Sequence, residues 1–242
     1  MPVGRLPLNY IPAPSRHYLI HNLLKAIHPQ NATIRRMPPE RINWNQRYAT
    51  RDTPWDSGRP SLELHRVLEE YQIPPGDALE LGCGTGTNAI FLAQRGFRVT
   101  ALDISPLAIE QAQAKGRASG VSVHFMVADL LSPPDLGRRY SFVFDRGLYH
   151  SVRETGLEPL LRTLEQVTAA GGLMLALTGN ANDTAPADRG PPRVQAEEIC
   201  REMGGLFELV QLREFHFDGV VIEGQPVRPL GWSALLRRKA HA

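Results

Sequence analysis

The sequence predicts an α/β fold, with a mostly parallel β-sheet, helices on both faces and an antiparallel strand at the C-terminal end. Short apolar runs typical of strands alternate with segments of helical periodicity from residue 61 to residue 203. Strand, helix and strand in that rhythm require parallel pairing through crossover helices. No helical segment separates the last two apolar runs, so these two strands are antiparallel if they pair with each other.

Capping residues, glycines and apolar spacing define the individual elements. Ser61 is a good N-cap, Gly96 is a typical helix end, and Pro106 after Ser105 is typical of a first helical turn. We expect helices over residues 61–71, 88–95, 105–119, 158–169 and 195–203. We expect strands over residues 78–81, 97–102, 121–127, 140–144, 172–177, 207–217 and 230–237, and a long polar loop over residues 178–192.

The first forty residues differ in composition from the rest. Seven prolines interrupt them, and residues 17–27 carry apolar side chains at helical spacing. We therefore expect residues 1–43 to form a proline-rich N-terminal arm with one short helix, either packed on the domain or partly mobile. Residues 44–242 are expected to form the main domain.

The bulk composition excludes several classes of function. The chain has 242 residues, 42% of them hydrophobic, and a formal net charge of +2. So small a charge gives no electrostatic case for binding nucleic acid, and no apolar run is long enough for a membrane span. Two cysteines cannot form a disulfide framework or a four-ligand zinc site. We therefore expect a reducing, cytoplasmic location, no metal site and no membrane or nucleic-acid partner.

The most informative stretch is a glycine-rich turn after the first expected strand, Glu80-Leu81-Gly82-Cys83-Gly84-Thr85-Gly86. Glycines allow a sharp turn and the close approach of a ligand, and open sheets bind ligands at the carboxyl ends of their strands. A dinucleotide-binding loop has glycine at its first, third and sixth positions, whereas Thr87 occupies the sixth position here. A nicotinamide-dependent oxidoreductase is therefore disfavoured.

Two further acids follow at the ends of the next two expected strands. Asp103 ends the second strand, where an acid can accept hydrogen bonds from both hydroxyls of a ribose or can simply cap a helix. Asp129 ends the third strand. Acids at three successive strand ends form a more specific pattern than any one of them alone.

The turn and the two acids together resemble motif I and the following strands of class I S-adenosylmethionine (SAM) dependent methyltransferases. The resemblance covers roughly residues 44–239 and implies a Rossmann-like, mostly parallel seven-stranded sheet with an antiparallel C-terminal strand. It implies SAM as the cofactor, with S-adenosylhomocysteine as its product. The cofactor-binding residues that it implies are Trp44, Trp55, Glu80, Gly82, Cys83, Gly84, Gly86, Thr87, Asp103, Ile104, Asp129, Leu130 and Asp145.

Two further stretches resemble the group of thiopurine S-methyltransferases, halide/thiol methyltransferases and tellurite-resistance methyltransferases. In that group a tryptophan pair before motif I helps to close over the cofactor. By position the pair is Trp44 and Trp55, although both could instead anchor the arm. The run Asp145-Arg146-Gly147 matches the thiopurine enzymes after strand four, whose end points at the transferable methyl group.

The same resemblance implies that Arg146, Tyr149 and His150 are catalytic. Arg146 would orient or polarise the acceptor, or would form an ion pair. Tyr149 and His150 would line the acceptor site, and His150 would act as a base for a weakly acidic acceptor or would be structural.

Methyl transfer to a small molecule is thus the expected function, most of all to a thiol or a related soft nucleophile. An O- or N-methyltransferase of a hydroxylated or heterocyclic metabolite is the main alternative, and a SAM-binding module without turnover is another. Protein or nucleic-acid methylation is disfavoured, because the chain has no basic face and no Asn-Pro-Pro-Tyr motif. The expected partner is a small-molecule substrate, with the chain as a monomer or homodimer.

Overall fold

The computed structural model of the protein describes residues 42–186 and 190–240. The predicted arm lies outside the described residues apart from its last two positions, and so does the helix expected over residues 17–27. Within the described part, no helix combines the length and the apolar character needed to cross a bilayer.

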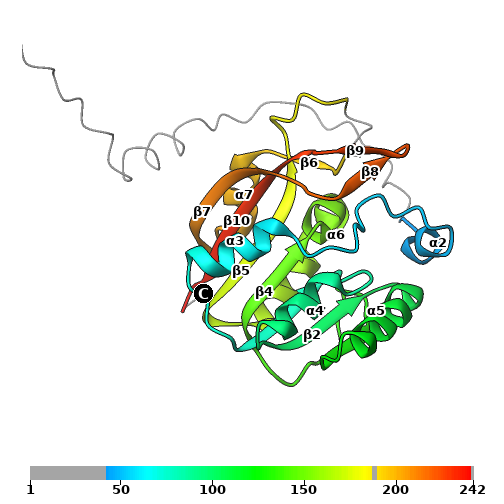
Figure 1. Ribbon diagram of the computed structural model, residues 1–242. Helices are drawn as coiled ribbons and strands as arrows, with labels where there is room; N and C mark the ends of the chain where they lie inside the picture. Colours follow the sequence, from blue (N-terminus) through cyan, green and yellow to red (C-terminus); the bar gives the residue numbers. More distant parts are fainter. Residues whose placement is uncertain (1–41, 187–189, 241–242) are drawn as a thin grey trace, which may run out of the picture. The chain divides into compact units, whose positions relative to one another are not determined.

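A mostly parallel sheet forms the centre of the described residues (Figure 1). Its strands are β1 (Asp77–Leu81), β2 (Arg98–Asp103), β3 (Val123–Val127), β4 (Tyr140–Arg146), β5 (Thr168–Asn180), β6 (Arg193–Val194), β7 (Phe207–His216) and β10 (Leu230–Arg238). The main path runs β3-β2-β1-β4-β5-β10-β7, and β6 pairs with the end of β5. β10 is antiparallel to both of its neighbours, whereas the other pairs are parallel. The predicted seven-stranded path and its antiparallel C-terminal strand are confirmed.

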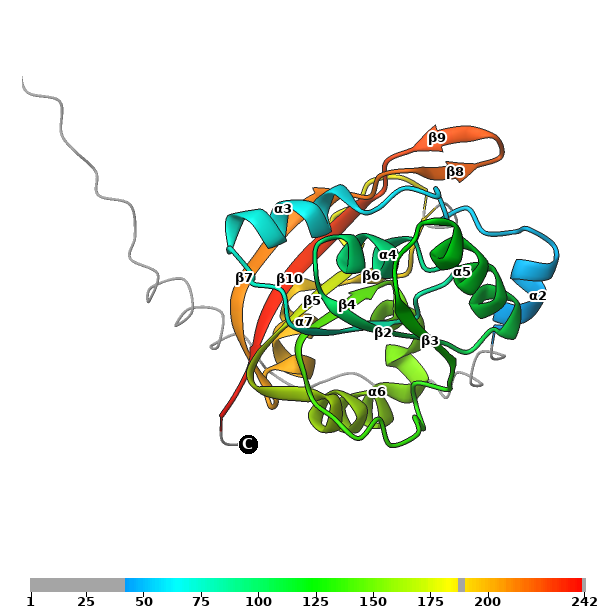
Figure 2. The same cartoon turned by 60° about the horizontal axis from the view of Figure 1, so that its bottom comes forward.

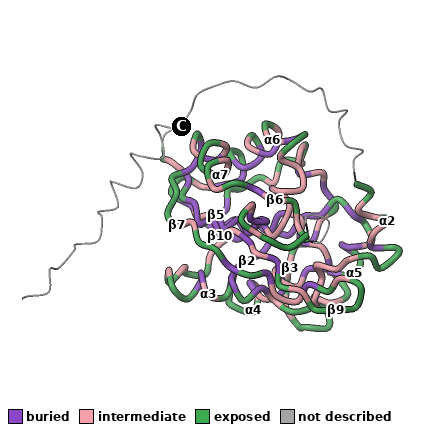
Figure 3. The backbone as a smooth tube through the Cα atoms, turned by 90° about the horizontal axis from the view of Figure 1, so that it is seen from above, coloured by how far each residue is buried: buried purple, intermediate pink, exposed green. Residues whose placement is uncertain are grey.

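Helices cover both faces of this sheet, as predicted (Figure 2). One face carries α3 (Leu62–Glu70), α4 (Thr87–Gln94) and α5 (Pro106–Ala118), and the other carries α6 (Leu148–Val167) and α7 (Ala196–Met203). Successive side chains of a strand point to opposite faces. Ala78 of β1 therefore joins the core under α3 to α5, and Leu79 joins the core under α6 and α7. Figure 3 shows buried backbone along the central strands.

The helix caps follow the sequence signals closely. The Ser61 side chain accepts a hydrogen bond from the backbone of Leu64, and Ser105 caps α5 in the same way with Pro106 at the first helical position. Such caps satisfy backbone N–H groups that have no partner within the helix.

Three departures from the predicted elements affect the site. α6 begins at Leu148 rather than at residue 158. Its first half was not predicted because Gly156, whose backbone is non-helical, and Pro159 interrupt the helical pattern of the sequence. β5 continues to Asn180, so the first three residues of the predicted loop belong to a strand. A helix, α2 (Trp44–Ala49), and a hairpin of β8 (Val220–Ile222) with β9 (Gln225–Val227) were not predicted.

Candidate active site

The glycine-loop region, defined as residues 80–88 with Asp103, lies at the carboxyl ends of β1 and β2. Its backbone requires glycine, because left-handed φ values cost an L-residue about 1–2 kcal/mol. Three glycines have such values: Gly82 at 66°, Gly84 at 54° and Gly86 at 77°. At Gly84 the space is also limited, since an added Cβ would lie 2.7 Å from the hydroxyl oxygen of Tyr48.

Glu80 is buried within this region, with 2% of its surface exposed. Its Oε1 accepts a hydrogen bond from Asn88 Nδ2 at 3.3 Å, whereas Oε2 is buried without a hydrogen-bond partner among the described residues. Burial raises the pKa of Glu80 to about 8, although hydrogen bonds from Asn88 and the Ala89 backbone act in the opposite direction. A buried polar atom without a partner is unfavourable, so Glu80 Oε2 marks a position that a polar ligand would satisfy.

Asp103 ties the glycine loop to the end of β2. Its Oδ2 accepts from the backbone N–H of Gly84 at 2.8 Å, and its Oδ1 accepts from the N–H of Ser105 at 2.9 Å. Burial raises the pKa of Asp103, and these backbone donors lower it. Each carboxylate oxygen can accept more than one hydrogen bond, so the role as a turn anchor and the role as a ligand acceptor are compatible.

The remaining residues implied for the cofactor lie around the same strand ends. Cys83 and Leu130 are buried, and Ile104, directly after Asp103, is 45% exposed. The Oγ1 of Thr87 accepts from Lys115 Nζ at 3.1 Å. Asp129 follows β3, where its Oδ1 accepts from the N–H of Leu131 at 2.9 Å.

Asp145, at the end of β4, caps α6. As neighbours in a strand, Asp145 and Arg146 point to opposite faces of the sheet. The two carboxylate oxygens of Asp145 accept from the N–H groups of Leu148 at 2.7 Å and Tyr149 at 2.9 Å. Burial raises the pKa of Asp145 to about 7, whereas these donors lower it. A carboxylate at this helix N-terminus also benefits from the helix dipole.

Arg146 and His150 form the second part of the site, the Arg146–His150 region. Arg146 Nη1 donates to the carbonyl oxygen of Trp55 at 3.1 Å, and Nη2 donates to that of Asp218 at 3.2 Å. Its guanidinium carbon lies 5.3 Å from the ring centroid of Phe217. Burial lowers the pKa of Arg146, and the charge of Asp218 raises it. Arg146 thus joins two chain segments through their main-chain oxygens while presenting a positive charge at the end of β4.

His150 lies on the first turn of α6 and is half-buried. Its Nδ1 is 3.1 Å from the backbone nitrogen of Gly179 and 3.2 Å from Thr178 Oγ1. Burial lowers the pKa of His150 to about 3, and the charge of Arg146 acts in the same direction. The structure thus brings His150 within the influence of Arg146.

Tyr149 has a different setting from its two neighbours. Its hydroxyl donates to Glu202 Oε2 of α7 at 2.7 Å, and its ring lies in the core beneath α6 and α7. Arg153 of α6 also contacts Glu202. These contacts join α6 to α7, and they do not bring the Tyr149 hydroxyl to Arg146 or His150.

A cover segment, residues 44–61, contacts both parts of the site. Its two tryptophans meet edge to face, with the ring centroids of Trp44 and Trp55 5.6 Å apart. Arg47 places its guanidinium carbon 4.4 Å from the ring centroid of Trp55. Asp56 Oδ2 accepts from Thr85 Oγ1 at 2.7 Å. The predicted tryptophan pair is thus brought together on a segment that contacts the glycine loop and Arg146.

Comparison with known proteins gives consistent matches. Residues 78–172 match a family model described as a methyltransferase domain. The chain is 29% identical over 147 residues to the 2-heptyl-1-hydroxyquinolin-4(1H)-one methyltransferase of Mycobacteroides abscessus and 27% identical over 136 residues to the probable thiol methyltransferase 2 of Arabidopsis thaliana. These matches cover 60% and 55% of this chain, and 64% and 60% of the relatives.

A solved structure from work on the conversion of a disulfide bond into a thioacetal group during echinomycin biosynthesis is also similar. It matches with a TM-score of 0.67 and 26% identity, over 78% of this chain and 85% of that one. The fold of the described residues agrees with these matches. The chain carries a class I SAM-dependent methyltransferase domain.

The site of this methyltransferase domain fits the cofactor that the family implies. SAM combines an amino-acid end, with an ammonium and a carboxylate group, with a nucleoside. The unpartnered Glu80 Oε2 is a suitable acceptor for the ammonium group, and Asp103 is a suitable acceptor for ribose hydroxyls. The positive-φ glycines leave the loop backbone without side chains.

Several residues of the candidate site were not predicted from the sequence. Tyr48 reaches Gly84, Asn88 holds Glu80, and Thr178 with Gly179 fixes the His150 ring. Tyr48 lies one helical turn after Trp44, a spacing that could have indicated it. The Thr178 contact had no local signal, because it joins residues 28 positions apart.

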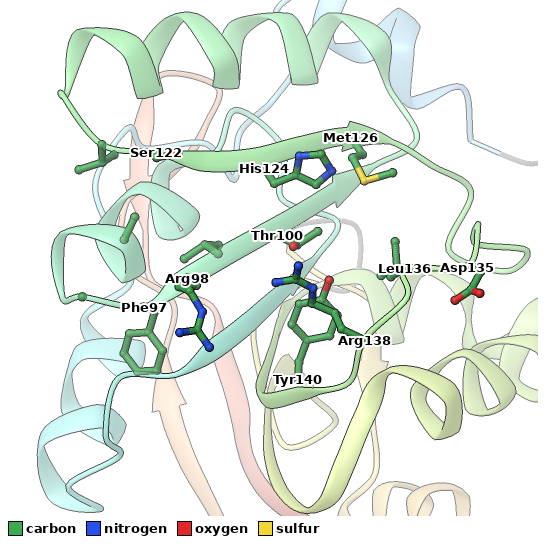
Figure 4. A pocket seen from close by; sticks show the side chains of 14 residues that line it. Phe97, Arg98, Thr100, Ser122, His124, Met126, Asp135, Leu136, Arg138 and Tyr140 are labelled. Atoms are coloured by element: carbon green, nitrogen blue, oxygen red, sulfur yellow. The ribbon is translucent and has the colours of Figure 1, made fainter.

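A cavity of about 730 Å³ lies away from these residues (Figure 4). Residues 128–139 between β3 and β4 contain no helix, and the cavity opens against the faces of β2 and β3. Its lining includes Arg98, Thr100, His124, Met126, Leu136 and Arg138. None of the predicted site residues lines it.

Proposed function

We propose that the protein is a SAM-dependent methyltransferase that acts on a small-molecule acceptor, most of all on a thiol or a related soft nucleophile. The observation that carries the proposal is the positive charge of Arg146 at the end of β4, next to a glycine loop suited to SAM. A nearby cation favours the thiolate form of a thiol, which is the nucleophile. The relative named a thiol methyltransferase supports this acceptor class.

The proposed cofactor contacts follow the strand ends. Glu80 and the loop glycines would hold the amino-acid end of SAM, and Asp103 would hold the ribose. Ile104, Asp129 and Leu130 would surround the adenine. Trp44 and Trp55 would close over the cofactor through the cover segment. Asp145 would contribute through α6, whose first turn it caps.

When bound, SAM supplies a methyl carbon on a positive sulfur: the acceptor's lone pair forms the new bond, and the carbon–sulfur electron pair stays on sulfur. The residues of this chain contribute alignment and exclusion of water. Arg146 would orient the acceptor, and the cover segment would shield it.

A second candidate is O- or N-methylation of a heterocyclic hydroxylated metabolite. One observation favours it specifically, namely the similarity to a methyltransferase named for a hydroxyquinolone.

Labelled methyl transfer from SAM distinguishes the two candidates. The acceptor panel holds small thiols, thiopurines, iodide and tellurite in one set, and phenols and hydroxyquinolines in the other. Transfer to the first set supports the proposal, and transfer confined to the second establishes the alternative. No transfer to any acceptor, with SAM bound, would indicate a binding module.

Cofactor binding can be tested separately by calorimetry. Asp103→Asn replaces one accepting oxygen with a donor next to Gly84 and Ser105, and we expect about a tenfold to hundredfold loss of SAM affinity. Asp77→Asn is the control, because Asp77 lies at the opposite end of β1 and pairs with Arg98 on the surface. Equal effects of the two substitutions would contradict the role of Asp103.

A further inference from the structure

The orientation of the His150 ring determines which of its nitrogens carries the proton. The backbone N–H of Gly179 points at Nδ1 at 3.1 Å, and an N–H can only donate. Nδ1 must therefore offer its lone pair, and the Thr178 hydroxyl, 3.2 Å away, can donate to the same atom. A neutral imidazole with a bare Nδ1 carries its proton on Nε2.

The Nε2 side of the ring faces the end of β4. A Cβ built on Gly147 would lie 3.2 Å from His150 Nε2, which places this edge of the ring at the turn directly after Arg146. The N–H of the neutral ring and the guanidinium of Arg146 are both hydrogen-bond donors. The Arg146–His150 region therefore offers positive electrostatic potential and N–H groups.

Protonation of the ring would oppose this geometry. A proton on Nδ1 would face the Gly179 N–H, donor against donor, and the added charge would lie near Arg146, the charged residue that acts on His150. Desolvation acts in the same sense and lowers the pKa of His150 to about 3. The ring is therefore poorly suited to receive a proton from an acceptor.

The acidic side chains around Arg146 accept hydrogen bonds from other groups. Asp56 accepts from Gly58 and Thr85, and Asp218 accepts from the backbone of Leu62. Glu80, whose charge also acts on Arg146, accepts from Asn88 and is the acceptor proposed above for the amino group of SAM. Both oxygens of Asp145 are held by the first turn of α6. A neutral acceptor entering this region would meet N–H donors, and each nearby carboxylate already serves another partner.

We propose that His150 is a fixed Nε2–H donor rather than a general base, and that the acceptor enters already ionised. This deepens the proposed function and rests on it. The acceptors that suit this site are then those whose nucleophilic atom is already an anion near neutral pH. The anion's lone pair forms the bond to the methyl carbon, the old bond pair stays on the cofactor sulfur, and no proton passes to the protein.

The ring itself provides the first test. In the full-length protein labelled with ¹⁵N-histidine, nitrogen shifts report the protonation of each ring atom, and His150→Gln identifies the signals by their disappearance. We expect a neutral ring with Nε2 protonated, unchanged between pH 8 and pH 5. A proton on Nδ1, or a titration midpoint near neutrality, would overturn the proposal whether or not an acceptor has been found.

Kinetics provide the second test, with a series of aryl thiols whose own pKa values are graded. We expect the midpoint of the pH profile of kcat/KM to move with the pKa of each acceptor. Gln can still donate from its amide, so His150→Gln should stay within about threefold of wild type, whereas His150→Leu should lose about tenfold or more with every acceptor.

A midpoint shared by all acceptors and abolished in His150→Gln would establish a base and overturn the proposal. Absence of methyl transfer to any acceptor would overturn the proposed function and the acceptor class together. In that case the nitrogen shifts would still decide the state of His150 independently.

Discussion

The glycine-loop region and the Arg146–His150 region are assembled in different ways. In the first, Glu80 contacts Asn88 eight residues away, and Asp103 contacts Gly84 nineteen residues away. In the second, Arg146 contacts Trp55 across 91 positions and Asp218 across 72. The glycine-loop region is therefore encoded in one βαβ unit, whereas the Arg146–His150 region depends on segments from both ends of the domain. Changes in the first should act on SAM binding, and changes in the second on turnover.

The largest contrast is expected in the pH dependence of stability. The pKa of Glu80 is raised from 4.5 to about 8, so its contribution to the free energy of unfolding falls as the pH rises through that range. The pKa of His150 is lowered from 6.5 to about 3, so its contribution is lost as the pH falls below 6.5. As the pH rises from 5 to 8, the free energy of unfolding of Glu80→Gln should therefore increase by about 3 kcal/mol relative to that of wild type.

Urea denaturation at several pH values measures this contrast. His150→Gln should deviate in the opposite sense, gaining about 2 kcal/mol relative to wild type as the pH falls from 8 to 5. Asp103 and Asp145 also have raised pKa values, but they are present in wild type and in both variants, so their contributions cancel when each variant is compared with wild type. Curves parallel to wild type for both variants would show that neither group is perturbed as described.

Arg146→Ala should separate turnover from binding. It removes the charge and the hydrogen bonds to the carbonyl oxygens of Trp55 and Asp218. Because the acceptor would then be poorly aligned with the methyl group, we expect kcat to fall by about 100-fold. SAM affinity, measured by calorimetry, should change less than about threefold. Arg98→Ala, which removes an exposed arginine at the start of β2, is the control. Equal losses of turnover and affinity would assign Arg146 a structural role instead.

Gly84→Ala should show the reverse pattern. The new Cβ would lie 2.7 Å from the Tyr48 hydroxyl, and the residue would be held at a φ of 54°. We expect about a tenfold loss of SAM affinity and a decrease of about 1–2 kcal/mol in the free energy of unfolding. Gly120→Ala has a similar φ, 68°, with open space around it, so it should lose stability alone. Unchanged SAM affinity in Gly84→Ala would remove the loop from the cofactor site.

The smallest effect is expected at Tyr149. Tyr149→Phe removes the hydrogen bond to Glu202 and should lower the free energy of unfolding by about 1 kcal/mol, with turnover within about threefold of wild type. Thermal denaturation and initial rates measure the two quantities. A large loss of turnover at unchanged stability would restore the catalytic role that the sequence resemblance implies.

Much of the fold was predictable because its signals are local. Ser61, Ser105 and Pro106 marked helix starts correctly, and the alternation of strands and helices gave the parallel sheet. The first half of α6 was missed because Gly156 and Pro159 interrupt its helical pattern, and because Asp145, whose side chain accepts from its first turn, lies in a strand. The hairpin of β8 and β9 was missed because its strands are three residues each, too short for periodicity.

Local sequence signals predict the sheet, its antiparallel C-terminal strand and the glycine loop with its acids, because spacing and turn chemistry act over a few residues. The different contacts of Asp145, Arg146, Tyr149 and His150 became visible only in the tertiary structure. The period of two along β4 sends Asp145 to the helix and Arg146 to the cover segment. Contacts with Glu202 and Gly179, remote in sequence, then fix the Tyr149 hydroxyl and the tautomer of His150.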